Sequence, residues 1–203
     1  RSVPWVAGCQ EEPIRYDGRR WDERYRTTPS LEPRPPDSLT VWPDLASQLA
    51  RAGRALDIAS GPGSVALWAA RRGFDVTALD ASAVAIALLE RTADDLGPTG
   101  GLSGRLDARV VDLDEGLPAD IIDVDLIVCQ RFRDPALTTT IIDRLSVGGY
   151  ALVTVLSAVG AERPGDFHAP PAALSTEFGD DDRCDVLHHH EGDGVAHIVV
   201  RRR

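Results

Sequence analysis

The feature that most constrains this chain is a glycine-rich turn between an apolar strand and an apolar-periodic helix. Residues 55–59 are apolar except for Asp57 and predict a short buried strand, and residues 64–72 have the spacing of a helix. Gly61 and Gly63 lie between them. Glycines let a ligand approach the backbone closely, and the helix that begins there aims its N-terminus at that ligand. The pattern therefore predicts a ligand site at this junction.

Strand and helix patterns alternate over the rest of the chain, up to a terminal pair of strands around a turn at residues 191–194. The strands are expected at 55–59, 75–79, 108–111, 125–129, 150–156, 183–189 and 196–201, and the helices at 43–52, 64–72, 82–96 and 136–145. This order predicts a doubly wound, Rossmann-like α/β fold. We expect a seven-stranded, mostly parallel sheet with a C-terminal antiparallel hairpin and helices on both faces.

The first 36 residues differ from the remainder, with six prolines and weak periodicity. We interpret residues 1–36 as a Pro-rich N-terminal arm or lid, and residues 37–203 as a single domain. A short helix would place Trp21 and Tyr25 on one face. That face would either fasten the arm to the body or cover a ligand. The chain begins without Met, so the sequence leaves open whether a leader preceded Arg1.

Acidic residues lie at or directly after the ends of the first three predicted strands, at the edge where ligands bind to such sheets. Asp80 after the second strand is placed to accept hydrogen bonds from ribose hydroxyls, and Asp112 after the third to accept one from an adenine amino group. Asp57 would repel a pyrophosphate and attract an ammonium group. Residues 61–66 also match a G-x-G-x-x-A dinucleotide pattern, so a nicotinamide-dependent reductase stays as a less favoured alternative.

These motifs together resemble class I S-adenosylmethionine-dependent methyltransferases. The acid and glycine turn of residues 57–63, Asp80, Asp112 and the glycine pair of residues 148–150 match, with Ala59 where the family usually has glycine. Residues 21–25, residues 72–80 and the closing hairpin are similar to the small tellurite-resistance and thiopurine-type branch. The resemblance implies S-adenosyl-L-methionine as cofactor and methyl transfer to a small-molecule acceptor. A cofactor-binding protein with lost or regulatory activity is the alternative.

The resemblance also implies two sets of site residues. The cofactor would contact Asp57, Ala59, Gly61, Gly63, Asp80, Ala81, Asp112, Leu113 and Gln130. The acceptor pocket would include Trp21, Tyr25, Arg131, Phe132 and His168. No residue identifies itself as a catalytic base, and the atom that receives the methyl group cannot be read from the sequence.

A run of three histidines, residues 188–190, raises the question of a metal site together with Cys184 and His197. Adjacent strand residues point to opposite faces, so only His188 and His190 can share one. Three consecutive histidines therefore cannot converge on one ion. We expect no metal here and an ordinary, half-exposed edge strand instead.

The composition limits which binding partners and which cellular compartment we expect. The net charge of −10 argues against nucleic acid, because phosphate binding needs a basic face. No apolar run approaches the ~20 residues of a membrane span. Three widely spaced cysteines, Cys9, Cys129 and Cys184, give no disulfide framework and favour a reducing cytoplasm. We expect a cytoplasmic monomer or homodimer.

Overall fold

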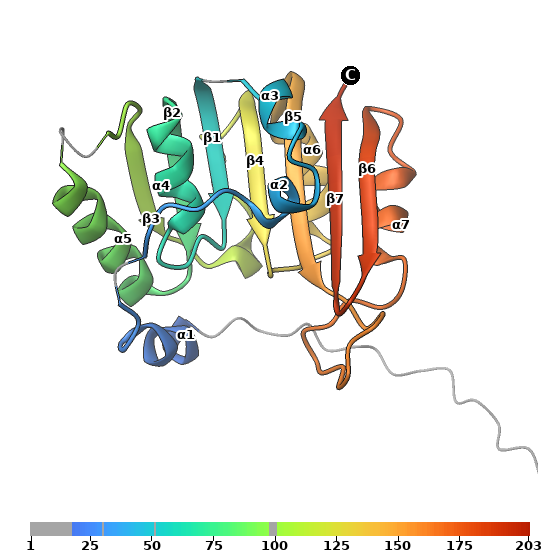
Figure 1. Ribbon diagram of the computed structural model, residues 1–203, viewed down its shortest axis with the longest axis horizontal. Coiled ribbons are helices and arrows are strands. Elements are labelled where there is room, and N and C mark those ends of the chain that lie inside the picture. The colour runs from blue at the N-terminus through green and yellow to red at the C-terminus, as the bar shows by residue number, and fades with distance from the viewer. Residues whose placement is uncertain (1–17, 30, 51, 98–100) are drawn as a thin grey trace, which may run out of the picture.

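The protein folds around one seven-stranded sheet with the strand order β3-β2-β1-β4-β5-β7-β6 (Figure 1). The computed structural model describes residues 18–29, 31–50, 52–97 and 101–203. Strands β1 to β5 are parallel, and β7 runs antiparallel to both β5 and β6. The strands are β1 Gly53–Ile58, β2 Phe74–Asp80, β3 Leu106–Val110, β4 Val124–Gln130, β5 Leu145–Leu156, β6 Cys184–Gly192 and β7 Val195–Arg202. The expected sheet and its terminal hairpin are confirmed.

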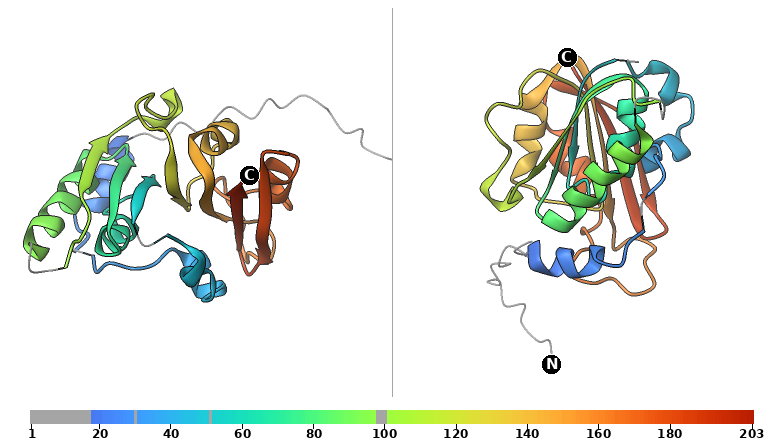
Figure 2. Two further views of the ribbon diagram at one scale, coloured as in Figure 1. Left: turned by 90° about the horizontal axis from the view of Figure 1, so that it is seen from above. Right: turned by 90° about the vertical axis from the view of Figure 1, so that its left-hand side faces the viewer.

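Helices cover both faces of this sheet (Figure 2). They are α1 Gly18–Tyr25, α2 Asp37–Val41, α3 Leu45–Gln48, α4 Ser64–Arg71, α5 Ala83–Leu96, α6 Leu137–Arg144 and α7 Ala173–Gly179, with a 3-10 turn, η1, at Leu113–Glu115. None of these described helices has the length and apolar character that crossing a bilayer requires.

Alternation along the strands divides the core into two hydrophobic clusters. On β1, Leu56 and Ile58 pack in the cluster that includes α6 and α7, whereas Ala55 packs in the cluster that includes α4 and α5. Both faces of the central strands are thus buried, as expected for a parallel sheet. Asp57, between these positions, points to the α4 side and brings a carboxylate into a core layer.

Three sequence-based boundaries are wrong. The helix expected at 43–52 is shorter, since α3 covers only Leu45–Gln48. A separate helix, α2, precedes it, and Trp42 before Pro43 leaves helical geometry between the two, with φ −125° and ψ 78°. Strand β5 begins at Leu145, so Gly148 and Gly149 lie inside a strand with a register irregularity against β4. Helix α7 was not expected at all, since no long periodic run marks it.

The carboxyl ends of β1, β2, β4 and β5 all meet at one edge of the sheet, at the bottom of Figure 1. Helix α1 and the loop 157–172 lie below this edge. Residues 21–25, expected to form a short helix, belong to α1, while residues 1–17 of the predicted arm lie outside the described part of the chain. The arm segment that is described therefore adjoins the edge where ligands of this fold class bind.

Candidate functional site

Asp57 is the most deeply buried charged residue at this edge, with 4% of its surface exposed. Its Oδ2 atom has no hydrogen-bond partner. Burial raises the pKa of this carboxyl to about 8; the backbone N–H of Ala66 in α4 acts in the opposite direction, and the charge of Asp80 raises the pKa further. An orphaned carboxylate oxygen in the core is costly unless a ligand group meets it. A cationic ligand group is the partner that would also ionise it.

Asp80 lies at the end of the neighbouring strand and is held by backbone donors. Its Oδ2 accepts a 2.7 Å hydrogen bond from the Gly61 N–H, and its Oδ1 accepts a 2.8 Å bond from the Ser82 N–H. Burial raises the pKa of Asp80, the two N–H groups oppose that shift, and Asp22 adds to it. Each oxygen keeps a lone pair for a hydroxyl donor. The structure therefore brings Asp57 and Asp80 together beside the glycine turn.

The turn itself depends on left-handed backbone at three positions. Ala59, Gly61 and Gly63 have φ values of 54°, 54° and 80°. Gly63 also precedes α4, and a Cβ there would lie 2.2 Å from Cδ1 of the buried Leu89. The two glycines are required by conformation and by space, whereas Ala59 adopts a geometry that costs an L-residue about 1 kcal/mol.

Helix α1 is attached to the same edge through Asp22. The Asp22 Oδ1 accepts hydrogen bonds from Ser82 Oγ at 2.6 Å and from the Val84 N–H at 3.1 Å. The Trp21 and Tyr25 rings stack with centroids 5.9 Å apart, as the shared helix face predicted. A Cβ on Gly61 would lie 3.0 Å from the Tyr25 hydroxyl, which places Tyr25 against the turn.

On the opposite side of the edge, α1 contacts the loop that follows β5. The Arg20 guanidinium lies 5.2 Å from the centroid of the Phe167 ring. His168, expected in the acceptor pocket, is hydrogen-bonded within this loop, where its Nδ1 accepts from the Gly165 N–H at 3.0 Å. The structure thus places His168 near the edge without a described contact to the acidic residues.

The remaining cofactor candidates occupy the ends of β2 and β3. Asp112 is exposed and its Oδ1 accepts from the Asp114 N–H at 3.0 Å, so it begins the η1 turn. Leu113 is 3% exposed and packs in the core, which leaves only its backbone to face a ligand. Ala81 is half-buried between Asp80 and the start of α5.

At the end of β4, the backbone bends at Arg131. Gln130 Oε1 accepts a 2.6 Å hydrogen bond from the Asp37 N–H of α2. Arg131 has φ 59°, and its Nη2 lies 3.5 Å from Asp37 Oδ2. Asp37 and the neighbouring Ser38 were not expected in the site. Ser38 is fully buried and its Oγ has no partner, so a second orphaned polar atom lies on the α2 segment.

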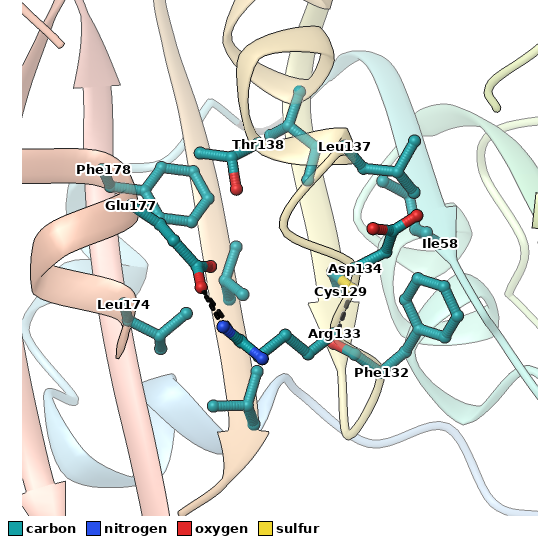
Figure 3. A pocket seen from close by; sticks show the side chains of 13 residues that line it. Ile58, Cys129, Phe132, Arg133, Asp134, Leu137, Thr138, Leu174, Glu177 and Phe178 are labelled. Atoms are coloured by element: carbon teal, nitrogen blue, oxygen red, sulfur yellow. Dashed lines mark hydrogen bonds and ion pairs between the residues drawn. The ribbon is translucent and has the colours of Figure 1, made fainter. Parts of the chain in front are cut away.

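Phe132 turns into the molecule and lines a narrow pocket between β4, α6 and α7 (Figure 3). The pocket has room for about one water molecule. Arg133 and Glu177 pair across it, with Nη2–Oε1 2.5 Å and Nε–Oε1 2.9 Å. Phe132 is 5% exposed, so its ring belongs to the core rather than to the open edge where the acceptor pocket was expected.

The histidines lie on the other half of the sheet. His188 stacks on Trp42 at 4.9 Å, and His190 stacks on His197 at 6.4 Å. His197 is buried, and its Nδ1 and Thr154 Oγ1 are 2.9 Å apart. Burial lowers the pKa of His197, Asp37 raises it, and His190 lowers it. In the described part of the chain, no three His, Cys, Asp or Glu side chains form a group that could hold a metal ion.

Two residues that sequence reasoning missed, Asp22 and Asp37, each connect an N-terminal segment to a strand end. The sequence carried one signal for Asp37, because an acidic residue after Pro36 is a common helix start. Asp22 lies in residues 21–25, which were expected to form a short helix, but no local pattern indicates its contact with Ser82, sixty residues away. Ser82 itself was expected as the N-cap of α5, and its Oγ does accept from the Ala85 N–H at 3.1 Å.

Comparison with known protein families gives a match that includes the strand ends described above. Residues 55–148 match the family model described as a methyltransferase domain. A comparison with curated protein sequences finds no match. The matched segment begins at β1 and ends within β5, so it contains Asp57, the glycine turn, Asp80, Asp112 and Arg131.

Three solved structures illustrate the shared fold. TehB from Haemophilus influenzae is 21% identical with a TM-score of 0.61, and the match covers 81% of this chain and 62% of that one. An S-adenosylmethionine-dependent methyltransferase from Methanosarcina mazei is 18% identical with a TM-score of 0.63, covering 79% and 97%. Geranyl diphosphate C-methyltransferase from Streptomyces coelicolor is 16% identical with a TM-score of 0.63, covering 81% and 76%.

The family model and the sheet order agree with the motifs at the strand ends. The nicotinamide alternative has no support from the matched family. Residues 55–148 thus match a methyltransferase domain, and the sheet has the fold of solved S-adenosylmethionine-dependent methyltransferases.

Proposed function

We propose that this protein transfers a methyl group from S-adenosylmethionine to a small-molecule acceptor. One observation carries the proposal. Two buried carboxyls, Asp57 and Asp80, lie at the ends of adjacent parallel strands beside a glycine turn, and Asp57 Oδ2 has no partner. A ligand with an ammonium group and a ribose satisfies both. The acceptor class is supported by the acidic net charge of −10, which disfavours nucleic acid.

The residues present fit this cofactor. Asp57 would receive the ammonium group of the methionine tail, and Asp80 the ribose hydroxyls. Asp112 and the Leu113 backbone would meet the adenine. The backbone of the turn and of the strand ends would line the remainder of the site through Ala59, Gly61, Gly63, Ala81 and Gln130. When bound, the cofactor supplies a methyl group from a positively charged sulfur, and this methyl group passes to a nucleophile as the carbon–sulfur bond breaks.

The chain's own contribution is then positioning and exclusion of water. Holding two reactants in line can lower the barrier by ~7–11 kcal/mol. Tyr25 is not suited to act as a base near neutral pH, because burial and the charge of Asp80 raise its pKa to about 12. A base is needed only for an acceptor that must lose a proton. Tyr25 and Trp21 serve here as an aromatic wall beside the cationic sulfur.

Helix α1 acts as the lid of this site. It is attached to α5 by Asp22 and reaches the β5–α7 loop through the contact between Arg20 and Phe167. In Figure 1, α1 lies below the β3 and β2 side of the sheet and the loop 157–172 lies below β5 and β7, so the contact between Arg20 and Phe167 bridges the space between them. A lid in this place shields the reacting groups from water. In this division of the chain, the arm has a role in catalysis as a lid, and residues 37–203 form the methyltransferase domain.

The cysteines of the described chain bear on the cellular compartment. Cys129 and Cys184 are free and buried, which favours a reducing cytoplasm. We infer a cytoplasmic enzyme with neither nucleic acid nor membrane as partner, working as a monomer or homodimer. Gel filtration with light scattering measures the oligomeric state.

Calorimetry tests the central proposal. S-adenosylmethionine and S-adenosylhomocysteine should bind wild-type protein, and Asp57→Ala and Asp80→Ala should weaken both. NAD should not bind; a thermal shift with NAD alone would favour the reductase. A screen with labelled methyl donor against thiols, phenols, carboxylates and oxyanions then separates an active enzyme from a binding protein with lost activity.

A further inference from the structure

Arg131 occupies an unusual position at the end of β4. It is a non-glycine residue with φ 59°, and its N–H donates a 2.7 Å hydrogen bond to the Thr154 carbonyl of β5. Left-handed backbone costs such a residue about 1 kcal/mol, and strain of this kind gathers at functional sites. Phe132, next in the chain, is buried, whereas the Arg131 side chain remains 68% exposed. The bend thus delivers a guanidinium to the open edge.

This guanidinium has a weak partner. Its Nη2 lies 3.5 Å from Asp37 Oδ2, longer than a hydrogen bond of good geometry. Asp37 is held at this place by its backbone, whose N–H donates to Gln130 Oε1 at 2.6 Å. The Asp37 carboxylate, 45% exposed, can therefore turn away without moving α2. An incoming anion could replace it on Arg131.

The positive charges of Arg131 and of the proposed cofactor favour an anion between them. Arg131 directly follows Gln130, which ends β4 and is a proposed cofactor-binding residue. A positive charge at this strand end disfavours a cationic cofactor unless a negative group lies between the two charges. A carboxylate suits the flat guanidinium, which binds it through two parallel hydrogen bonds. It is also already ionised at neutral pH, so a carboxylate acceptor needs no general base.

We propose that Arg131 anchors a carboxylate of the methyl acceptor, which displaces Asp37 from the guanidinium. The assignment rests on the proposed methyltransferase function and names its substrate class: small organic acids. The aromatic residues of the edge, Trp21 and Tyr25 of the lid, favour an aromatic or apolar body on that acid.

The test uses benzoate as a probe on the full chain saturated with S-adenosylhomocysteine, by calorimetry or ligand-observed NMR. Wild-type protein should bind benzoate and not benzamide. Arg131→Asn, which tolerates left-handed backbone, should weaken benzoate by about tenfold. Asp37→Asn removes the competing carboxylate and should tighten benzoate by about threefold. Arg54→Gln, an exposed arginine at the start of β1, is the matched control and should change nothing.

Each contrary result overturns the assignment. These results are undetectable benzoate binding, equal affinity in wild type and Arg131→Asn, benzamide binding as well as benzoate, or inorganic phosphate binding as tightly as benzoate. Thermal unfolding of every variant verifies folding. S-adenosylhomocysteine is titrated separately: its failure to bind would overturn the proposed function and this assignment together, whereas failure with benzoate alone overturns only the acceptor class.

Discussion

Asp22 of α1 accepts a 2.6 Å hydrogen bond from the hydroxyl of Ser82, the N-cap residue of α5. Ser82 Oγ also accepts from the Ala85 N–H, and Asp22 takes a second bond from the Val84 N–H. Asp22 and Ser82 thus satisfy the first amides of α5 jointly. Because the Ser82 N–H donates to Asp80, the lid and the proposed ribose-binding carboxyl share one helix start.

Replacing Asp22 should therefore loosen the lid. Asp22→Ala removes two hydrogen bonds to the start of α5, and we expect it to lower the free energy of unfolding by on the order of 1 kcal/mol. It should also weaken S-adenosylhomocysteine several-fold and speed proteolysis of α1. Glu23→Ala, an exposed neighbour on the same helix, is the control. Equal affinities for the two variants would show that α1 has no part in binding.

The ionisation of Asp57 gives the stability and the binding a pH dependence. Its pKa of about 8 in the folded chain lies above the value of about 4 for an unfolded aspartate. Between these values the folded chain keeps a proton that the unfolded chain has lost. The free energy of unfolding therefore falls as pH rises through this window. Comparing denaturant unfolding of wild type and Asp57→Asn at pH 5 and pH 8 should reveal a decline specific to wild type.

The same carboxyl predicts proton release on binding. An ammonium group beside Asp57 favours its ionised form, so S-adenosylhomocysteine should bind wild type more tightly as pH rises from about 6 to about 8. Calorimetry in two buffers of different ionisation enthalpy counts the protons released. Asp57→Asn should lose both the trend and the proton release. A flat affinity profile in wild type would contradict an ammonium contact.

Ala59 is strained where it stands. With φ 54°, Ala59→Gly relieves about 1 kcal/mol of backbone strain, offset in part by the greater freedom of glycine in the unfolded chain. We expect its midpoint in urea to be unchanged or higher. Ala69→Gly, within α4, should lower the free energy of unfolding by about 1 kcal/mol. Similar losses in both variants would rule out strain at Ala59.

Thr154 of β5 is hydrogen-bonded to the buried His197 of β7. Thr154→Val leaves the Nδ1 of the buried His197 without its partner, and we expect a loss of ~1–3 kcal/mol in the free energy of unfolding. Thr139→Val, an exposed position on α6, should change stability by less than about 0.5 kcal/mol. The difference between the two in denaturant unfolding isolates the buried bond; equal values would mean that it contributes nothing.

Much of the fold could be predicted because its signals are local. The apolar runs around Asp57 and Asp80, the N-cap at Ser82 and the glycine turn each specify an element from neighbouring residues alone. Alternating strands and helices then leave few topologies. Short helices were harder: α2, α3 and α7 have four to seven residues, too few for periodicity to distinguish them from loops.

The sequence by itself determined the sheet, its order of elements and the acidic strand ends, because these depend on local patterning and on the parallel arrangement it dictates. Only the tertiary structure decided which side chains meet. It buried Asp57 without a partner for Oδ2, turned Phe132 inward and Arg131 outward, and brought Asp22 and Asp37 to the site from the arm and from α2. These contacts join residues tens of positions apart, and distance along a chain carries no signal of proximity in space.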